Sequence, residues 1–180
     1  YYLECGNGRT EMKNQVFFAD LNVGGKTLLD KLDRLLERTD LKGKIQEKDL
    51  VAIKLHFGEK GNTAYVRPIF LKRLVDRIKD CRGKPFLTDT NTLYRGMRQE
   101  AVSHLTTAYE NGFAYSVVGA PVLVAGGLRG NSAAKVRIDR PLFKTVSIAH
   151  DIHMADALIG VTHFKGHELS GFGGTIKNLG

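Results

Sequence analysis

Cysteine, tryptophan and long apolar runs are scarce in this sequence. Its 180 residues include two cysteines, Cys5 and Cys81, and no tryptophan. Two thiols are too few for a disulfide-rich fold, and they cannot supply the four thiolates of an ordinary iron–sulfur cluster. No apolar run approaches the roughly 18–20 residues that a transmembrane helix needs, so we expect no membrane partner. Residues 1–11 have no signal-peptide pattern, and a cytoplasmic location is therefore the expectation.

The composition is that of one soluble globular domain. Hydrophobic residues make up 42% of the chain and charged residues 26%, which excludes a disordered, collagen-like or coiled-coil protein. The net charge is +8, but residues 1–90 hold 18 basic and 13 acidic residues and residues 91–180 hold nine and six. Because the excess is spread along the chain, we expect a surface that attracts small anions. Nucleic-acid binding is the less favoured alternative.

Short apolar runs alternate with amphipathic stretches along most of the chain. The expected helices cover residues 28–36, 66–78 and 101–109, because their apolar residues recur at helical spacing. The apolar face of the last helix would consist of Ala101, Val102, Leu105, Ala108 and Tyr109. The expected strands cover residues 16–19, 50–55, 86–88, 115–118 and 157–161. This alternation predicts an α/β fold, with a mostly parallel sheet flanked by helices.

Residues 121–147 depart from this alternation. Gly126-Gly127 and Asp139-Arg140-Pro141 are typical turn sequences, and they separate three short apolar segments, 122–125, 136–138 and 143–147. The pattern predicts a small antiparallel β excursion around residues 121–147. No repeat or low-complexity linker divides the chain, so we expect a single domain.

Polar and ionisable side chains follow three of the expected strands, in loops where a simple connection needs none. They are His56, Glu59, Asp89, Asn91, His163 and His167. Parallel sheets bind ligands beyond the carboxyl ends of their strands. We therefore expect the three loops to converge on one cleft.

A glycine-rich segment follows the last of these strands. Gly171, Gly173 and Gly174 would let the backbone approach a ligand, and a helix that starts near Thr175 would add the positive end of its dipole. This suits a phosphate or a carboxylate, although a tight turn explains the same residues equally well. The segment is neither a Walker A loop nor a dinucleotide fingerprint, because Gly-Lys-Ser/Thr is absent and residue 176 is Ile.

Two further features suggest chemistry, each with a simpler alternative. His163 and His167 are four residues apart, which is a metal-ligand spacing if the segment is helical; the alternative is a pair of surface or hydrogen-bonded histidines. A third ligand would come from His56, Glu168 or Asp89. Lys54 lies inside an apolar strand, where a buried amine needs a partner. The alternative for Lys54 is an edge position with the amine in solvent.

Four segments resemble one known family. They are Val51 to Gly61 (VAIKLHFGEKG), Lys84 to Leu93 (KPFLTDTNTL), Asn111 to Pro121 (NGFAYSVVGAP) and His163 to Gly180 (HFKGHELSGFGGTIKNLG). The family is that of the uncharacterised iron–sulfur centre proteins, known as domain-of-unknown-function family 362. The similarity runs from about Met12, so residues 12–180 are the expected α/β domain and residues 1–11 an unmatched extension.

The resemblance implies a redox-associated role. Members of the family commonly carry a ferredoxin-type, cysteine-rich segment that holds a 4Fe–4S cluster, and this chain stops where that segment would begin. We therefore expect a domain truncated before its cluster-binding part. The two cysteines present cannot hold the cluster, so a missing segment or a redox partner would supply it.

A shorter stretch is similar to nickel-dependent lactate racemases. His167 to Lys177 (HELSGFGGTIK) resembles a segment in which that family has a His, a Gly-Phe-Ser-Gly-Gly run and a Lys; position 173 is Gly here instead of Ser. The similarity implies that His167 is a catalytic acid/base. It implies that Lys177 either carries a nickel-containing cofactor covalently or binds an anion.

Three functions follow as hypotheses. The first is a redox-associated domain that binds a small anionic ligand or cofactor; the second is an isomerase of the racemase type with a metal-containing cofactor; the third is a nucleic-acid binder. The expected catalytic residues are His56, Asp89, His167 and Lys177. The expected ligand-binding residues are Lys54, Glu59, Asn91, Gly171, Gly173, Gly174 and Thr175. Substrate, reaction and oligomeric state stay open at this point.

Overall fold

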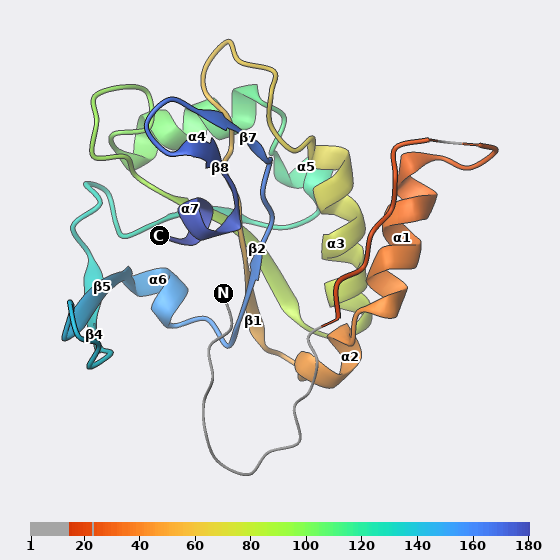
Figure 1. Ribbon diagram of the computed structural model, residues 1–180, viewed down its shortest axis with the longest axis horizontal. Helices are drawn as coiled ribbons and strands as arrows, with labels where there is room; N and C mark the ends of the chain where they lie inside the picture. The colour runs from red at the N-terminus through yellow and green to blue at the C-terminus, as the bar shows by residue number, and fades with distance from the viewer. Residues whose placement is uncertain (1–14, 23) are drawn as a thin grey trace.

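A four-stranded parallel sheet forms the centre of the computed structural model, which describes residues 15–22 and 24–180 (Figure 1). Its strands are, in spatial order, β3 (Val122–Ala125), β2 (Lys84–Thr90), β1 (Leu50–Lys54) and β6 (Ala157–Gly160). Ile53 in β1 pairs with Leu87 on one side and with Ile159 on the other. All three strand pairs are parallel, which confirms the predicted α/β class with a mostly parallel sheet.

Helices cover the sheet because each carries one apolar face. Helix α3 (Pro68–Asp80) packs on β2, and α1 (Leu28–Arg38) lies outside α3 (Figure 1). The remaining helices are short or peripheral: α2 (Leu41–Lys44), α4 (Ala101–Glu110), α5 (Tyr115–Val118), α6 (His150–His153) and α7 (Thr175–Leu179). Helix α4 packs against β3, and α7 packs against β6.

The core lies between α3 and the two central strands. Its fully buried side chains include Val51, Ile53, Val75, Ile78 and Leu87. Burying an aliphatic side chain of this size contributes about 1.5–3 kcal/mol, so this layer holds α3 against the sheet. Because all four strands run parallel, their carboxyl ends lie along one edge of the sheet.

Two antiparallel hairpins lie outside the main sheet. In the first, β4 (Ala133–Arg137) pairs with β5 (Thr145–Ala149), and in the second, β7 (Lys165–His167) pairs with β8 (Gly171–Gly173). The first hairpin confirms the predicted antiparallel excursion. However, residues 122–125 are not part of it, because they form β3 of the parallel sheet.

Two predicted strands are wrong. Residues 115–118 form the single helical turn α5, which ends at Gly119 in the left-handed conformation. Residues 16–19 have no regular structure. The strand predictions relied on β-branched and aromatic residues, and β propensity of this kind depends on a neighbouring strand being available.

The buried face of α4 also differs from the prediction. His104, Thr107 and Ala108 are its buried residues, whereas Val102 and Tyr109 are exposed. The predicted face is therefore correct for Ala108 and wrong for Val102 and Tyr109, because a histidine and a threonine face the interior instead.

Some predictions fall on residues outside the described part of the chain. Cys5, Met12 and the unmatched extension at residues 1–11 belong to this group. Among the residues that are described, no helix is both long enough and apolar enough to span a lipid bilayer.

Candidate functional site at the carboxyl edge of the sheet

Lys54 and Asp89 form a buried ion pair at the ends of β1 and β2. Lys54 Nζ lies 2.7 Å from Asp89 Oδ1 and also donates to Asn178 Oδ1 at 3.1 Å. Lys54 is 7% exposed and Asp89 is 4% exposed. Of the two alternatives for Lys54, the structure therefore has the buried amine with a partner.

Asp89 collects three basic groups. Besides Lys54, Arg98 Nη1 lies 3.2 Å from Asp89 Oδ2, and His104 Nε2 lies 3.4 Å from the same oxygen. Burial would raise the pKa of Asp89, but the nearby His104 and Lys54 outweigh this effect and lower the pKa to about 2. Asp89 is therefore a permanent carboxylate at neutral pH.

The orientation of His104 follows from Asn91. Asn91 Nδ2 donates to the Gly127 carbonyl at 3.3 Å, which leaves Asn91 Oδ1 as the acceptor for His104 Nδ1 at 3.2 Å. His104 Nε2 then faces Asp89 Oδ2, and this buried nitrogen has no hydrogen-bond partner of regular geometry within the described residues. Asn91 thus holds the His104 ring in place beside Asp89.

Arg98 connects the loops that follow β1 and β2. Its Nε and Nη2 atoms donate to Glu59 Oε1 at 2.9 and 2.5 Å, while Nη1 contacts Asp89. Tyr94 Oη accepts from Arg98 Nη2 at 2.5 Å and donates to Glu59 Oε1 at 3.0 Å. Desolvation would raise the pKa of Glu59, yet the hydrogen bond to Arg98 lowers it. Glu59 is therefore a paired carboxylate at neutral pH.

His56 is a half-buried, neutral imidazole beside this cluster. The backbone N–H of Gly58 donates to His56 Nδ1 at 2.8 Å, so Nδ1 carries no proton and the proton of the neutral ring is on Nε2. Burial lowers the pKa of His56 to about 4, and the positive charges of Arg98 and Lys165 act in the same direction. His56 consequently presents an N–H donor.

The glycine-rich segment forms β8 and the start of α7. A Cβ on Gly173 would meet Lys177 Cδ at 3.5 Å and Lys165 Cγ at 3.9 Å, so both lysine stems pass this glycine. Gly171 has φ +73°, the left-handed region that favours glycine. Gly174 precedes α7, whose first residue is Thr175, as the sequence predicts.

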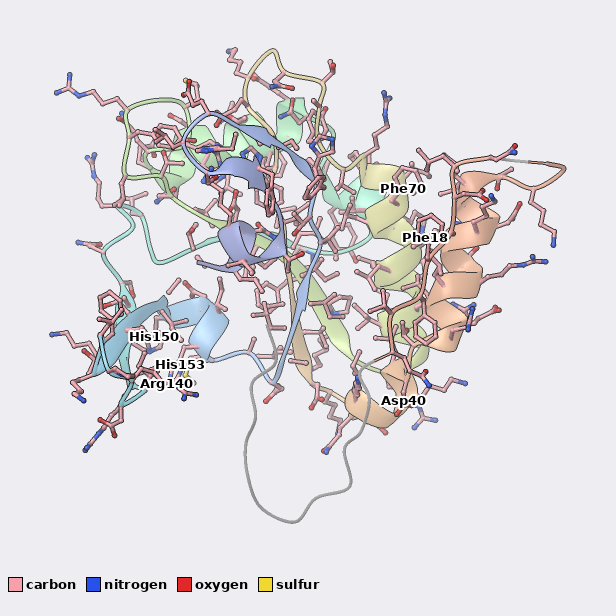
Figure 2. All side chains as sticks on the ribbon, in the orientation of Figure 1. Phe18, Asp40, Phe70, Arg140, His150 and His153 are labelled. Carbon is pink, nitrogen blue, oxygen red and sulfur yellow. The ribbon has the colours of Figure 1, made fainter. Side chains whose placement is uncertain are left out.

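His167 and His163 do not have the helical geometry on which the metal prediction depends. His167 ends strand β7. Its Nδ1 accepts the backbone N–H groups of Leu169 and Ser170 at 3.3 and 3.2 Å, so the neutral ring again carries its proton on Nε2. In the described part of the chain, no group of three His, Cys, Asp or Glu side chains is suitably arranged for a metal ion. Two other histidines, His150 and His153, lie on α6 beside the β4–β5 hairpin (Figure 2).

The structure links some of the predicted residues and leaves others apart. One network of hydrogen bonds and ion pairs contains Lys54, Glu59, Asp89 and Asn91, and the neutral His56 lies beside it with Nε2 4.0 Å from Glu59 Oε1. Lys177 lies at Gly173, next to Lys165, and His167 lies at the turn of the second hairpin. No interaction among the described residues joins His167 to Asp89. Two cavities lie elsewhere; the one of about 300 Å³ is lined by α1, α2 and α3 residues such as Leu36, Leu41 and Cys81.

Sequence reasoning missed four residues of this region. They are Tyr94, Arg98, His104 and Asn178. Arg98 had no sequence signal, because it lies in a polar loop. His104 had one, since it lies three and four residues from Ala101 and Ala108 on the buried face of α4.

A family model matches residues 51–180, under the description "Domain of unknown function (DUF362)". The matched range begins in β1 and ends after α7, so it contains the whole parallel sheet and every residue of the candidate site. No curated protein and no solved structure matches the chain. The family resemblance seen in the sequence is thereby confirmed, and the local similarity to lactate racemases stays a prediction.

Proposed function

Because the chain belongs to the DUF362 family, a family defined without a function, we propose its function from the site: the carboxyl edge of the sheet binds a small anionic ligand. The observation that carries this proposal is the pair of lysine stems, Lys165 and Lys177, that pass Gly173 in the glycine-rich segment. The ligand would be a phosphate or a carboxylate group, because charge-assisted N–H donors suit both.

The charges of the lysines support this function. Within the described residues neither Lys165 nor Lys177 has an ion-pair partner, whereas Lys54 is neutralised by Asp89. The positive charge of Lys165 also contributes to the lowered pKa of His56, after burial and Arg98. Two uncompensated positive charges at one glycine create a local positive potential that attracts an anion.

The histidine tautomers support it as well. His56 and His167 each accept a backbone N–H at Nδ1, so each presents Nε2–H and no lone pair at that nitrogen. An N–H group can donate to an anionic oxygen. It can neither ligate a metal ion through Nε2 nor abstract a proton there, so the isomerase alternative has less support than anion binding.

The redox-associated part of the proposal depends only on the resemblance of the sequence to iron–sulfur centre proteins. Four cysteine thiolates hold an ordinary cluster, and the sequence has two cysteines. Of these, Cys81 lies at the end of α3 as a free thiol. The cluster therefore does not fit the residues present. The role that we propose for this domain is to bind the anion that a redox partner acts upon.

Anion titrations followed by amide nitrogen–proton correlation spectra test the proposal. We expect inorganic phosphate or acetate, added at constant ionic strength, to shift the resonances of residues 171–175 in a saturable manner. Lys165→Gln and Lys177→Gln should each weaken the binding about tenfold, the effect of losing roughly 1.4 kcal/mol. Lys144→Gln, which removes an exposed lysine of the first hairpin, is the matched control.

Two outcomes would overturn anion binding at this edge. One is the absence of saturable shifts with both anions. The other is an equal loss of affinity in Lys144→Gln and Lys177→Gln, because binding would then follow the overall charge and not the site.

A further inference from the structure

Half of the net charge of the chain lies on the first hairpin and its flanks. Residues 126–149 contain five basic residues and one acidic residue, a net charge of +4 out of the +8 of the whole chain. The basic residues are Arg129, Lys135, Arg137, Arg140 and Lys144. Figure 1 shows the β4–β5 hairpin standing apart from the parallel sheet, and Figure 2 labels Arg140 on it. Four of these basic residues lie on the hairpin or its connecting loop, whereas Arg129 precedes the hairpin and follows Leu128, whose carbonyl accepts from the Ala101 backbone N–H at the start of α4.

The register of the hairpin places two of its basic residues, Lys135 and Arg137, on one exposed face. Lys135 pairs with Ser147, and Arg137 pairs with Thr145; all four are exposed. The opposite face carries apolar residues such as Val136, which is partly buried. This two-sided pattern follows from the alternation of side chains along a strand.

The tip of the hairpin is apolar. Leu142 is 88% exposed and Phe143 is 64% exposed, and Arg140 and Lys144 flank them. Asp139, the one acidic residue of residues 126–149, is paired with Arg137 at 2.6 Å. The tip therefore combines two adjacent exposed apolar side chains with a basic residue close by in the sequence on either side.

We propose that this hairpin docks on an anionic lipid surface. Leu142 and Phe143 would enter the boundary between headgroups and acyl chains, and the neighbouring basic residues would contact the negative headgroups. The projecting shape of the tip favours a deformable surface such as a bilayer interface. This inference is independent of the anion site, because the hairpin shares no residue with it.

Nucleic acid is the less suitable polyanion for this surface. Proteins that bind single strands stack bases on several aromatic side chains, and Phe143 is the one aromatic residue between 126 and 149. Leu142 has no ring on which a base could stack. Lipid accounts for both exposed apolar residues, and nucleic acid accounts for the charge alone.

Vesicle co-sedimentation of the full chain tests the proposal. We expect binding to vesicles of phosphatidylcholine and phosphatidylserine in equal parts, at least tenfold weaker binding to phosphatidylcholine alone, and weakening by added salt. Leu142→Ser combined with Phe143→Ser should reduce binding at least tenfold. The matched control is Leu169→Ser, which removes a leucine that is 90% exposed on the second hairpin. Lys144→Glu should weaken binding more than Lys26→Glu, a reversal at an exposed lysine before α1.

A fluorescence measurement reports directly on the tip. The chain has no tryptophan, so Phe143→Trp introduces a single tryptophan at the proposed contact. Its emission should shift to the blue when phosphatidylserine-containing vesicles are added. Phe164→Trp, at a phenylalanine that is 71% exposed, should show no shift.

Four results would overturn the proposal. They are no sedimentation with either vesicle, equal losses in the tip variant and in Leu169→Ser, retention on a single-stranded oligonucleotide that needs the basic residues but not the tip, and a dimer in sedimentation velocity that the tip variant abolishes. The last two would assign the surface to nucleic acid or to a second copy of this chain.

Discussion

At the scale of single residues, the site depends on charges that are buried in pairs. Removing an ammonium or carboxylate group from water costs several kcal/mol, which a partner at close range can offset. Lys54 and Asp89 meet this condition with an Nζ–Oδ1 distance of 2.7 Å. The apolar strand around Lys54 made its burial predictable, but its partner is 35 residues away and had no such signal.

Replacing Lys54 should therefore destabilise the fold strongly. We expect Lys54→Met to lower the free energy of unfolding by about 3 kcal/mol, because Asp89 keeps its buried charge and loses a partner. Lys72→Met is the matched control, since the Lys72–Asp76 pair has both side chains 45% exposed. Its loss should be below about 1 kcal/mol. Urea unfolding measures both, and equal losses would contradict the buried pair.

Arg98 should control the protonation of His56. Burial is the largest cause of the lowered pKa of His56, and the positive charge of Arg98 is the next. Arg98→Gln should therefore raise this pKa from about 4 toward the ordinary value, as followed by the histidine ring protons in an NMR titration. Arg98→Lys keeps the charge and should raise it less. Arg95→Gln removes an exposed arginine of the same loop and is the control. If Arg98→Gln gave the same His56 titration curve as Arg95→Gln, this role of Arg98 would be contradicted.

At the scale of elements, the loop after β1 depends on Gly58. This residue has φ +87°, and a Cβ there would lie 2.7 Å from Asn111 Nδ2 and from Tyr65 Cδ1. Gly61 in the same loop has φ +79° with nothing within 4 Å. Gly58→Ala should thus cost more stability than Gly61→Ala, by about 1–3 kcal/mol, the usual cost of overpacking. Thermal unfolding of the two variants measures the difference, and equal midpoints would contradict the packing around Gly58.

The sequence predicts an element when the buried residues are also the apolar ones. Strand β1 meets this condition, because Val51, Ala52 and Ile53 are all fully buried. The prediction fails for α5, whose Val117 is exposed and whose single turn ends at Gly119 in the left-handed conformation. It also fails for the face of α4, because His104 is buried there against Asp89.

At the scale of the whole molecule, the candidate site joins distant parts of the chain. Lys54 and Asn178 are 124 residues apart, yet the Asn178 side chain accepts from Lys54 Nζ and donates to its carbonyl. The rule that ligands bind at the carboxyl edge of a parallel sheet selected the loops after β1 and β2, which Arg98 joins through Glu59 and Asp89. The convergence of the loop that contains His163 and His167 on the same cleft stays a prediction. The rule could not predict Arg98 or Tyr94, because the path of a polar loop has no periodic pattern to read.

The stability of the whole molecule should decrease in two steps as the solution becomes acidic. The pKa of His56 is lowered from 6.5 to about 4, so the unfolded chain binds more protons than the folded protein between these values. Stability that is fully present above pH 6.5 is therefore lost as the pH falls toward 4. The pKa of Asp89 is lowered from 3.8 to about 2, which produces a second loss between pH 3.8 and 2.

His56→Gln separates the two steps, because glutamine has no proton to gain. Urea unfolding at a series of pH values should show a shallower decrease between pH 6.5 and 4 in this variant than in the parent protein, and a similar decrease below pH 3.8. His153→Gln is the matched control, since His153 is exposed on α6 and outside the cluster. If His153→Gln flattened the upper step as much as His56→Gln, the acid sensitivity would belong to histidines in general. A selective effect of His56→Gln would instead locate the acid sensitivity at His56, where the positive charge of Arg98 opposes protonation of the ring.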